Sequence, residues 1–185
     1  MLIDELKNIA RNNGIVGAGG AGFPAYAKMT EKADTVILNC VECEPLLKLH
    51  RQLLATHTEE IIQMLDEVRE SFGAKEAVIG IKSEYVTTIK AIEEVIGDFP
   101  NVRICALKAA YPMGDEVVLI YEATGRVIKP GGLPIDENVV VYNVETMYNL
   151  YRAVHLNIPV TNKLVSIVGE IDHPLTVRVP LGTTV

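Results

Sequence analysis

The sequence predicts an α/β fold, a three-layer Rossmann-like domain with a short, mainly parallel sheet. Short apolar runs at residues 35–39, 77–81 and 102–107 alternate with helical patterns of ten or more residues, and such alternation implies right-handed crossovers between parallel strands. Later in the chain, β-branched residues become frequent, which indicates a small β-rich element. We therefore expect a ligand-binding α/β domain over residues 1–160. The β-rich extension, residues 161–185, is expected to be the truncated start of a following domain.

Helices are expected in the first half wherever apolar residues recur at helical spacing. The first such pattern covers residues 3–10 and is followed by an Asn-Gly stop. Pro24 can open a short helix, because the first helical position has no N–H to satisfy. Thr56 and Glu59 have the spacing of a capping box and predict the start of a second long helix. Ser83 is expected to cap a third.

In the second half, Pro and Gly divide the chain into shorter elements. A turn that begins with a tyrosine precedes a helix, and a glycine follows the end of this helix. A stretch rich in Gly and Pro then separates it from a fourth strand and a last helix. The predicted segments are a turn at 111–116, a helix at 117–123, an irregular loop at 129–134, a strand at 139–142, a helix at 143–154 and β-structure at 164–179.

The composition limits the classes of partner and compartment. The formal net charge is −7, which argues against a nucleic-acid partner because phosphates are bound mainly through Lys and Arg. No apolar run approaches the ~18 residues of a membrane span, so we expect no direct membrane insertion. The chain has 3 cysteines, an odd and sparse set that fits a reducing compartment. These features predict a cytoplasmic protein.

A glycine-rich loop is the first candidate for ligand binding. Gly17, Gly19, Gly20 and Gly22 precede a Phe-Pro pair and would let backbone N–H groups approach a ligand closely. The spacing matches a dinucleotide fingerprint, but a helix precedes the loop where that fingerprint requires a strand. With a helix N-terminus after it, the loop could bind a phosphate or the edge of a flat ring. The alternative is a mobile surface loop.

The segment at residues 39–45 follows the first predicted strand, where parallel sheets bind ligands. Glu42 and Glu44 alternate, so an extended backbone would point both to one side. Such carboxylates suit sugar hydroxyls or the ring nitrogens of a flavin or nicotinamide. Cys40 and Cys43 could be a redox pair, half of a metal site or incidental thiols. We expect no metal site, because no second pair or histidine partner has ligand spacing.

Five segments in this order resemble a known family. They are GIVGAGGAGFPAYAK (14–28), NCVECEPLL (39–47), YPMGDE (111–116), the loop 129–134 and VVVYNVET (139–146). The series resembles the flavin-binding module shared by the C-type subunit of the Rnf electron-transport complex and the NADH-oxidising flavoprotein subunit of respiratory complex I. Residues 42–54 are most similar to the proline-reductase-associated electron-transfer protein and to the cobalamin reductase of propanediol utilisation.

The resemblance implies that residues 1–160 are an FMN-binding domain. Its FMN would be bound non-covalently, accept electrons from NADH and pass them to iron–sulfur clusters outside this segment. The implied FMN-binding residues are Gly17, Gly19, Gly20, Gly22, Lys28, Asn39, Glu42, Tyr111, Gly114, Asp115, Glu116, Asn143 and Thr146. Phe23 and Glu44 match NADH-binding positions. Without the resemblance, Lys28 is more often a solvated lysine, and Asp115 and Glu116 need do no more than cap a helix.

The sequence also departs from the family. Complex I subunits carry an aromatic residue where this chain has Met29-Thr30-Glu31, a phenylalanine within residues 131–134, and an asparagine at Tyr142. Three functions therefore stay open: an NADH-oxidising module, a flavin relay without an NADH site, and a nucleotide-binding scaffold without flavin chemistry. The implied partner is an iron–sulfur protein or domain, within a reductase or peripheral to a membrane complex. The last residues, 173–185, resemble the start of a β-grasp-like domain.

Overall fold

A computed structural model describes residues 1–184 and confirms the α/β class. Its main sheet has four parallel strands in the order β3-β2-β1-β4. A separate antiparallel pair, β5 with β6, follows in the chain. The strands are β1 (Thr35–Cys40), β2 (Glu76–Lys82), β3 (Val102–Leu107), β4 (Val139–Asn143), β5 (Asn162–Ile167) and β6 (Leu175–Pro180).

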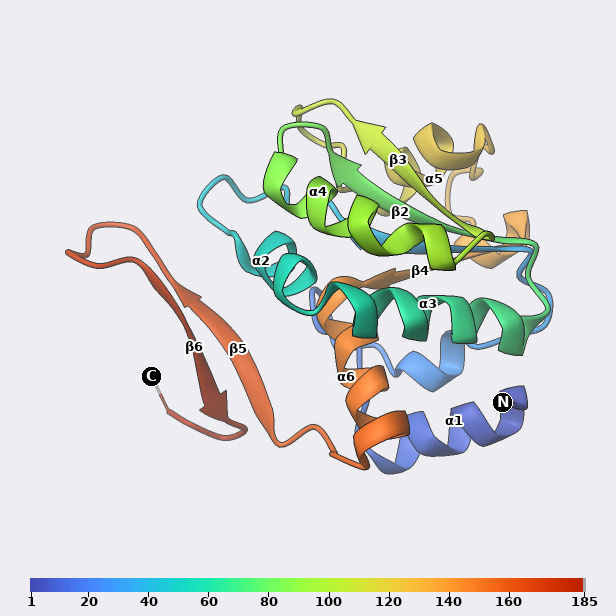
Figure 1. Cartoon of the computed structure of the whole chain (residues 1–185), viewed down its shortest axis with the longest axis horizontal. Helices are drawn as coiled ribbons and strands as arrows, with labels where there is room; N and C mark the ends of the chain where they lie inside the picture. The colour runs from blue at the N-terminus through green and yellow to red at the C-terminus, as the bar shows by residue number, and fades with distance from the viewer. Residues whose placement is uncertain (185) are drawn as a thin grey trace.

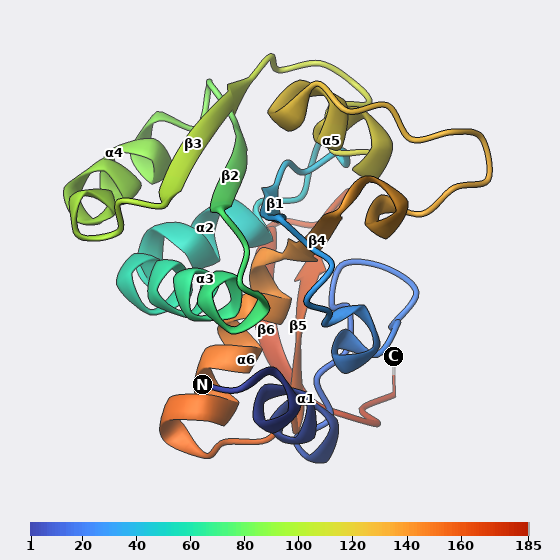
Figure 2. The ribbon, with the colours of Figure 1, turned by 90° about the vertical axis from the view of Figure 1, so that its right-hand side faces the viewer.

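Helices cover both faces of the main sheet and make three layers (Figure 2). α5 (Glu116–Thr124) packs on one face, against β2 and β3. On the other side lie α1 (Ile3–Asn12), α2 (Leu49–Thr56), α3 (Thr58–Phe72), α4 (Val86–Val95) and α6 (Val144–Leu156). Three short 3-10 helices complete the set: η1 (Ala25–Lys28), η2 (Ile96–Asp98) and η3 (Pro134–Glu137).

The alternation of strand side chains produces two separate cores. Val36 and Leu38 of β1 belong to the large core under α3 and α6, whereas Ile37 joins the smaller core under α5. All three side chains are fully buried, which explains why the strand reads as a continuous apolar run. A Cβ on Gly80 of β2 would meet Leu119 of α5, so this glycine lets α5 pack closely on the sheet.

Two predicted helix starts are wrong. Thr56 does not open the long helix, because it ends α2 and its hydroxyl donates to the Gln52 carbonyl within that helix. α3 begins at Thr58, and the capping-box bond with Glu59 is not made in the described chain. Ser83 likewise does not cap α4, which begins at Val86. α2 itself was not predicted.

The predicted β-rich end of the chain is confirmed as a hairpin. β5 and β6 project away from the main sheet (Figure 1). The Leu164 amide of β5 donates to Glu145 at the N-terminal end of α6. A boundary at residue 160, and a β-grasp-like continuation, stay predictions. Within residues 1–184, no helix is long and apolar enough to cross a membrane.

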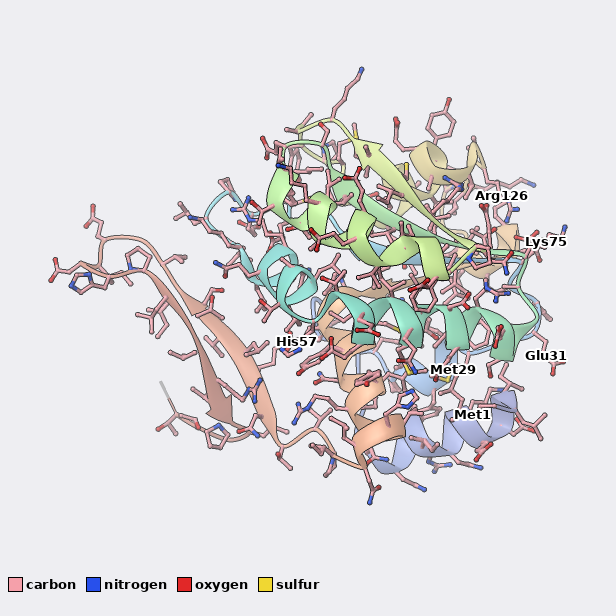
Figure 3. All side chains as sticks on the ribbon, viewed as in Figure 1. Met1, Met29, Glu31, His57, Lys75 and Arg126 are labelled. Carbon is pink, nitrogen blue, oxygen red and sulfur yellow. The ribbon has the colours of Figure 1, made fainter. Side chains whose placement is uncertain are left out.

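An ion pair closes the end of the sheet at which β1 and β4 begin. Arg126 donates from Nη1 to Asp34 Oδ1 at 2.6 Å and to the Glu137 carbonyl at 2.8 Å. Burial alone would raise the pKa of Asp34, but the hydrogen bonds from Arg126 and Thr35 and the charges of Arg126 and Lys75 together lower that pKa. Arg126 and Lys75 lie together at this end (Figure 3). The opposite end of the sheet is where the candidate site lies.

Candidate functional site

The candidate site lies at the carboxyl ends of β1 and β4, where parallel sheets usually bind ligands. Asn39 and Asn143 are paired across these neighbouring strands, so the loops that follow them begin side by side. The glycine loop and the 111–116 segment also reach this edge, through contacts with Asn143 and Asn39 respectively. Four segments that are far apart in sequence therefore converge here.

The glycine loop is closed on itself like a hairpin. Val16 and Pro24 form an antiparallel bridge, the Gly17 amide donates to the Phe23 carbonyl at 2.8 Å, and Gly22 has a left-handed φ of +70°. The short helix predicted after this loop is found as η1, a 3-10 helix of 4 residues with Pro24 at its N-cap. A short helix of this kind carries little dipole.

The first turn of α6 brings the N-terminus of a longer helix to the glycine loop. The Ala18 amide donates to Thr146 Oγ1 at 2.9 Å, and the Thr146 hydroxyl reaches the Val16 carbonyl at 3.3 Å. The loop thus rests on a 13-residue helix. The N–H groups of such a helix end can bind a phosphate.

Two of the loop glycines have different surroundings. A Cβ on Gly19 would lie 2.8 Å from Asn143 Nδ2 and 3.2 Å from His50 Cε1. A side chain at this position would therefore require the Asn143 side chain to shift. A Cβ on Gly20 would meet no atom within 4 Å in the described chain. The backbone of Gly20 is accordingly open to a ligand.

Asn39 joins two of the converging segments. Its Nδ2 donates to the Gly114 carbonyl at 3.0 Å, and its Oδ1 accepts from the Val41 amide at 2.9 Å. A Cβ on Gly114 would overlap the Val41 carbonyl oxygen and lie 2.7 Å from Cys43 Sγ. These contacts place the 111–116 segment directly on the 39–43 segment.

Glu42 is buried at the N-terminus of α2. Its Oε1 accepts from the His50 amide at 2.8 Å, and its Oε2 lies 3.6 Å from Arg51 Nε. Oε2 is buried without a hydrogen-bond partner among residues 1–184, and burial raises the pKa of the carboxyl. Glu44 is exposed. The expectation that both glutamates share one side is therefore wrong, because Glu42 turns inward to cap α2.

A groove of about 530 Å³ lies beside the edge strand β4. This volume falls within the about 300–1,000 Å³ of typical small-molecule sites. Lys28 Nζ lies 3.4 Å from both Glu116 Oε1 and the Val141 carbonyl at this groove. The lining residues are Phe23, Ala27, Lys28, Thr30, Lys32, Glu116, Leu133, Pro134, Ile135, Val139, Val140 and Val141.

Two predicted residues of the 111–116 segment differ in environment. Asp115 caps α5, accepting from the Val117 and Val118 amides at 3.0 and 3.2 Å. This confirms the capping that the sequence predicted. Tyr111 is 83% exposed, so its side chain is available to a ligand but lies outside the contacts that join the segments.

The cysteines form no cluster with other ligand-type side chains in the described part of the chain. Cys40 is buried, and burial strongly raises the pKa of its thiol. Cys43 and Cys105 are half-buried. Within the described residues, no three His, Cys, Asp or Glu side chains are grouped as a metal site.

These features fit a flavin nucleotide. The unpartnered Glu42 Oε2 can accept from a sugar hydroxyl or ring N–H, and the open backbone of Gly20 can approach a flat ring. The N-terminus of α6 can hold a phosphate, and the apolar wall of the groove suits an aromatic ring. The fold and the site together define a nucleotide-binding α/β domain.

Comparison with known proteins gives the family. Residues 10–152 match the Nuo51 FMN-binding domain, and the chain belongs to this family. It is 40% identical over 179 residues to the cobalamin reductase PduS of Salmonella typhimurium, covering 97% of this chain and 39% of the relative. It is 33% identical over 184 residues to a subunit of the Na(+)-translocating ferredoxin:NAD(+) oxidoreductase complex of Acetobacterium woodii, covering 97% of this chain and 42% of the relative.

The fold is shared with a solved structure. A chain of the NAD+-reducing [NiFe]-hydrogenase in the air-oxidized state superimposes with a TM-score of 0.81 at 24% identity, covering 98% of this chain and 37% of that chain. The family resemblance inferred from the five sequence segments is thus confirmed by the family match and the curated relatives. The chain spans about two fifths of the length of the two curated relatives.

Three residues near the site were not predicted. His50 packs beneath Gly19, and burial together with the charge of Lys163 lowers its pKa to about 4. Glu145 is buried in the first turn of α6 and pairs with Lys163 of β5. Nothing in the local sequence marks these residues, because their neighbours at the site come from distant segments.

Proposed function

We propose that this chain is the FMN-binding module of a longer oxidoreductase, in which it accepts electrons from NADH and passes them to an iron–sulfur protein or domain. The observation that carries the proposal is the contact of the glycine loop with the first turn of α6, at the edge where Asn39 and Glu42 also lie. This arrangement occurs in a chain that belongs to an FMN-binding family.

The residues proposed to hold FMN surround this edge. Lys28, Asn143 and Thr146 would lie toward the phosphate and ribityl chain, and Asn39 and Glu42 toward the polar side of the ring. The backbone of Gly17, Gly19, Gly20 and Gly22 would lie under the flavin, with Tyr111, Gly114, Asp115 and Glu116 beside it. When bound, FMN supplies a ring that accepts electron pairs and donates electrons to one-electron carriers.

The side chains of this protein would bind and tune that group. The Lys28 ammonium and the α6 N-terminus favour a phosphate. Carboxylates near the ring disfavour its anionic reduced form, so Glu42 would lower the reduction potential. A low potential suits electron transfer to a demanding acceptor.

NADH is the proposed electron donor. The groove beside β4 is lined by Phe23, an aromatic ring on which a nicotinamide or adenine can stack. The relative from Acetobacterium woodii is named as part of a ferredoxin:NAD(+) oxidoreductase complex, which supports a nicotinamide partner here. Glu44 is exposed and available to ribose hydroxyls. We place the module in the cytoplasm, alone or at the surface of a membrane complex.

The proposal is tested with purified protein incubated with FMN. We expect bound flavin absorption in the parent protein and its bleaching by NADH under anaerobic conditions. Gly20→Val should abolish FMN binding without unfolding the chain, because the added side chain meets open space. Gly97→Val is the matched control in η2, where a Cβ also meets no described atom within 4 Å. A parent protein that binds no FMN refutes the proposal, and flavin that NADH leaves oxidised refutes the NADH step alone.

A further inference from the structure

The β5–β6 hairpin contacts the glycine loop through one lysine. Lys163 of β5 donates from Nζ to the Ala18 carbonyl at 2.9 Å and also to Glu145 Oε2. The next backbone amide, that of Leu164, donates to Glu145 Oε1 at 3.4 Å. The side chain of Glu145 is 3% exposed, and that of Lys163 is 38% exposed.

Glu145 places a negative charge beside the proposed binding site of the FMN phosphate, which is also negatively charged. It is the second residue of α6 and directly precedes Thr146, whose hydroxyl holds the glycine loop. A carboxylate buried this close to a phosphate site would repel the phosphate, and burial strengthens such interactions. A buried carboxylate also needs a partner to offset its desolvation. Lys163 supplies that partner.

The same lysine fixes the backbone of the loop. The N–H of Ala18 is bound by Thr146 of α6, and its carbonyl is bound by Lys163 of β5. Both polar groups of this residue are thus held, between Gly17 and Gly19. His50 lies beside the loop, but its lowered pKa keeps it neutral at pH 7, so it does not supply the compensating positive charge.

We propose that Lys163 is a positioning residue for the phosphate end of the FMN site, acting through Glu145 and Ala18. It neutralises the buried carboxylate at the α6 N-terminus and holds the loop that would lie under the flavin. The hairpin is therefore part of the cofactor site. This inference rests on the proposed function, since it requires that the protein binds FMN.

The test compares FMN with riboflavin, which has the same ring and ribityl chain but no phosphate. Dissociation constants are measured by flavin fluorescence for the parent, Lys163→Met, Lys163→Arg, Glu145→Gln and the double variant Lys163→Met/Glu145→Gln. We expect Lys163→Met to weaken FMN binding about tenfold or more and riboflavin binding far less. Lys163→Arg should keep the parent's FMN-to-riboflavin affinity ratio, and Glu145→Gln should restore that ratio in the Lys163→Met background.

The outcomes separate this inference from the proposed function. A parent protein without FMN affinity refutes the proposed function, whereas an unchanged FMN-to-riboflavin ratio in Lys163→Met refutes the role of Lys163. An equal loss of both flavins would show a general structural effect and would also refute it. Lys90→Met, on the exposed side of α4, controls for net charge and should change neither affinity. If Lys163→Met does not fold, the double variant Lys163→Met/Glu145→Gln, which lacks the buried charge, is the test. An FMN-to-riboflavin affinity ratio below that of the parent in this double variant refutes the inference.

Discussion

Gly114→Ala should destabilise the protein and separate two segments of the site. The new Cβ would overlap the carbonyl oxygen of Val41 and lie 2.7 Å from Cys43 Sγ. A backbone oxygen cannot rotate away, so the 111–116 segment must move. Overpacking costs about 1–3 kcal/mol, and the Asn39 bond to the Gly114 carbonyl contributes about 1 kcal/mol more. We therefore expect a loss of about 2–4 kcal/mol in the free energy of unfolding.

Urea unfolding followed by circular dichroism measures this loss. Gly97→Ala is the matched control, because its Cβ would meet no described atom within 4 Å, and it should change the unfolding free energy little. The double variant Gly114→Ala/Cys43→Ala should recover only part of the loss, since it removes the sulfur contact and leaves the one with Val41. A Gly114→Ala protein as stable as the parent would show that the two segments do not pack as described.

Three further predictions concern charged and titratable groups. The pKa of His50 is about 4, against 6.5 for an unperturbed histidine, so the unfolded state binds more protons between these pH values. Stability should rise with pH across that window, by up to about 3 kcal/mol, and His50→Gln should flatten this part of a urea-unfolding series. Asp115→Ala should cost about 1 kcal/mol in thermal unfolding, while Asp115→Asn, which keeps a capping oxygen, should cost much less. Glu42→Gln should raise the two-electron potential of bound FMN by about 20 mV or more in a potentiometric titration. Glu116→Gln should raise it less, and equal shifts would contradict the reasoning.

Most elements of the fold could be predicted because their signals are local. The buried strands are short apolar runs, and each one is found where the sequence places it. α2 was missed because the residue directly before it, Lys48, makes no cap hydrogen bond, and the first-turn amide of His50 is instead bound by Glu42, eight residues earlier. Helix-start rules search the adjacent residues, so they found Thr56 instead. That threonine satisfies its hydroxyl within α2.

The convergence of the site segments could be predicted only in part. Asn39 and Asn143 each end a predicted strand, and parallel topology brings such ends to one edge. Strand order has no local signal, so the sequence could not show that β1 and β4 are neighbours. The roles of Glu145 and Lys163 depend on how the hairpin folds back against α6. Glu145 and Lys163 are 18 residues apart and lie in a helix and in a separate sheet. Residue periodicity in the sequence therefore gives no sign of their contact.

The four carboxylates of the 39–45 and 111–116 segments, Glu42, Glu44, Asp115 and Glu116, have different surroundings in the structure. The Asp115 carboxylate is occupied by the α5 N-terminus, Glu116 is paired with Lys28, and Glu44 is exposed. Glu42 alone among these four combines burial with an oxygen that has no hydrogen-bond partner in residues 1–184. Electrostatic influence grows as solvent is excluded, so the half-exposed Glu116–Lys28 pair and the exposed Glu44 should contribute less than the buried Glu42, although Glu42 Oε2 also lies 3.6 Å from Arg51 Nε. Any tuning of a bound flavin by this group should therefore be concentrated at Glu42, whose other oxygen fixes its position by capping α2.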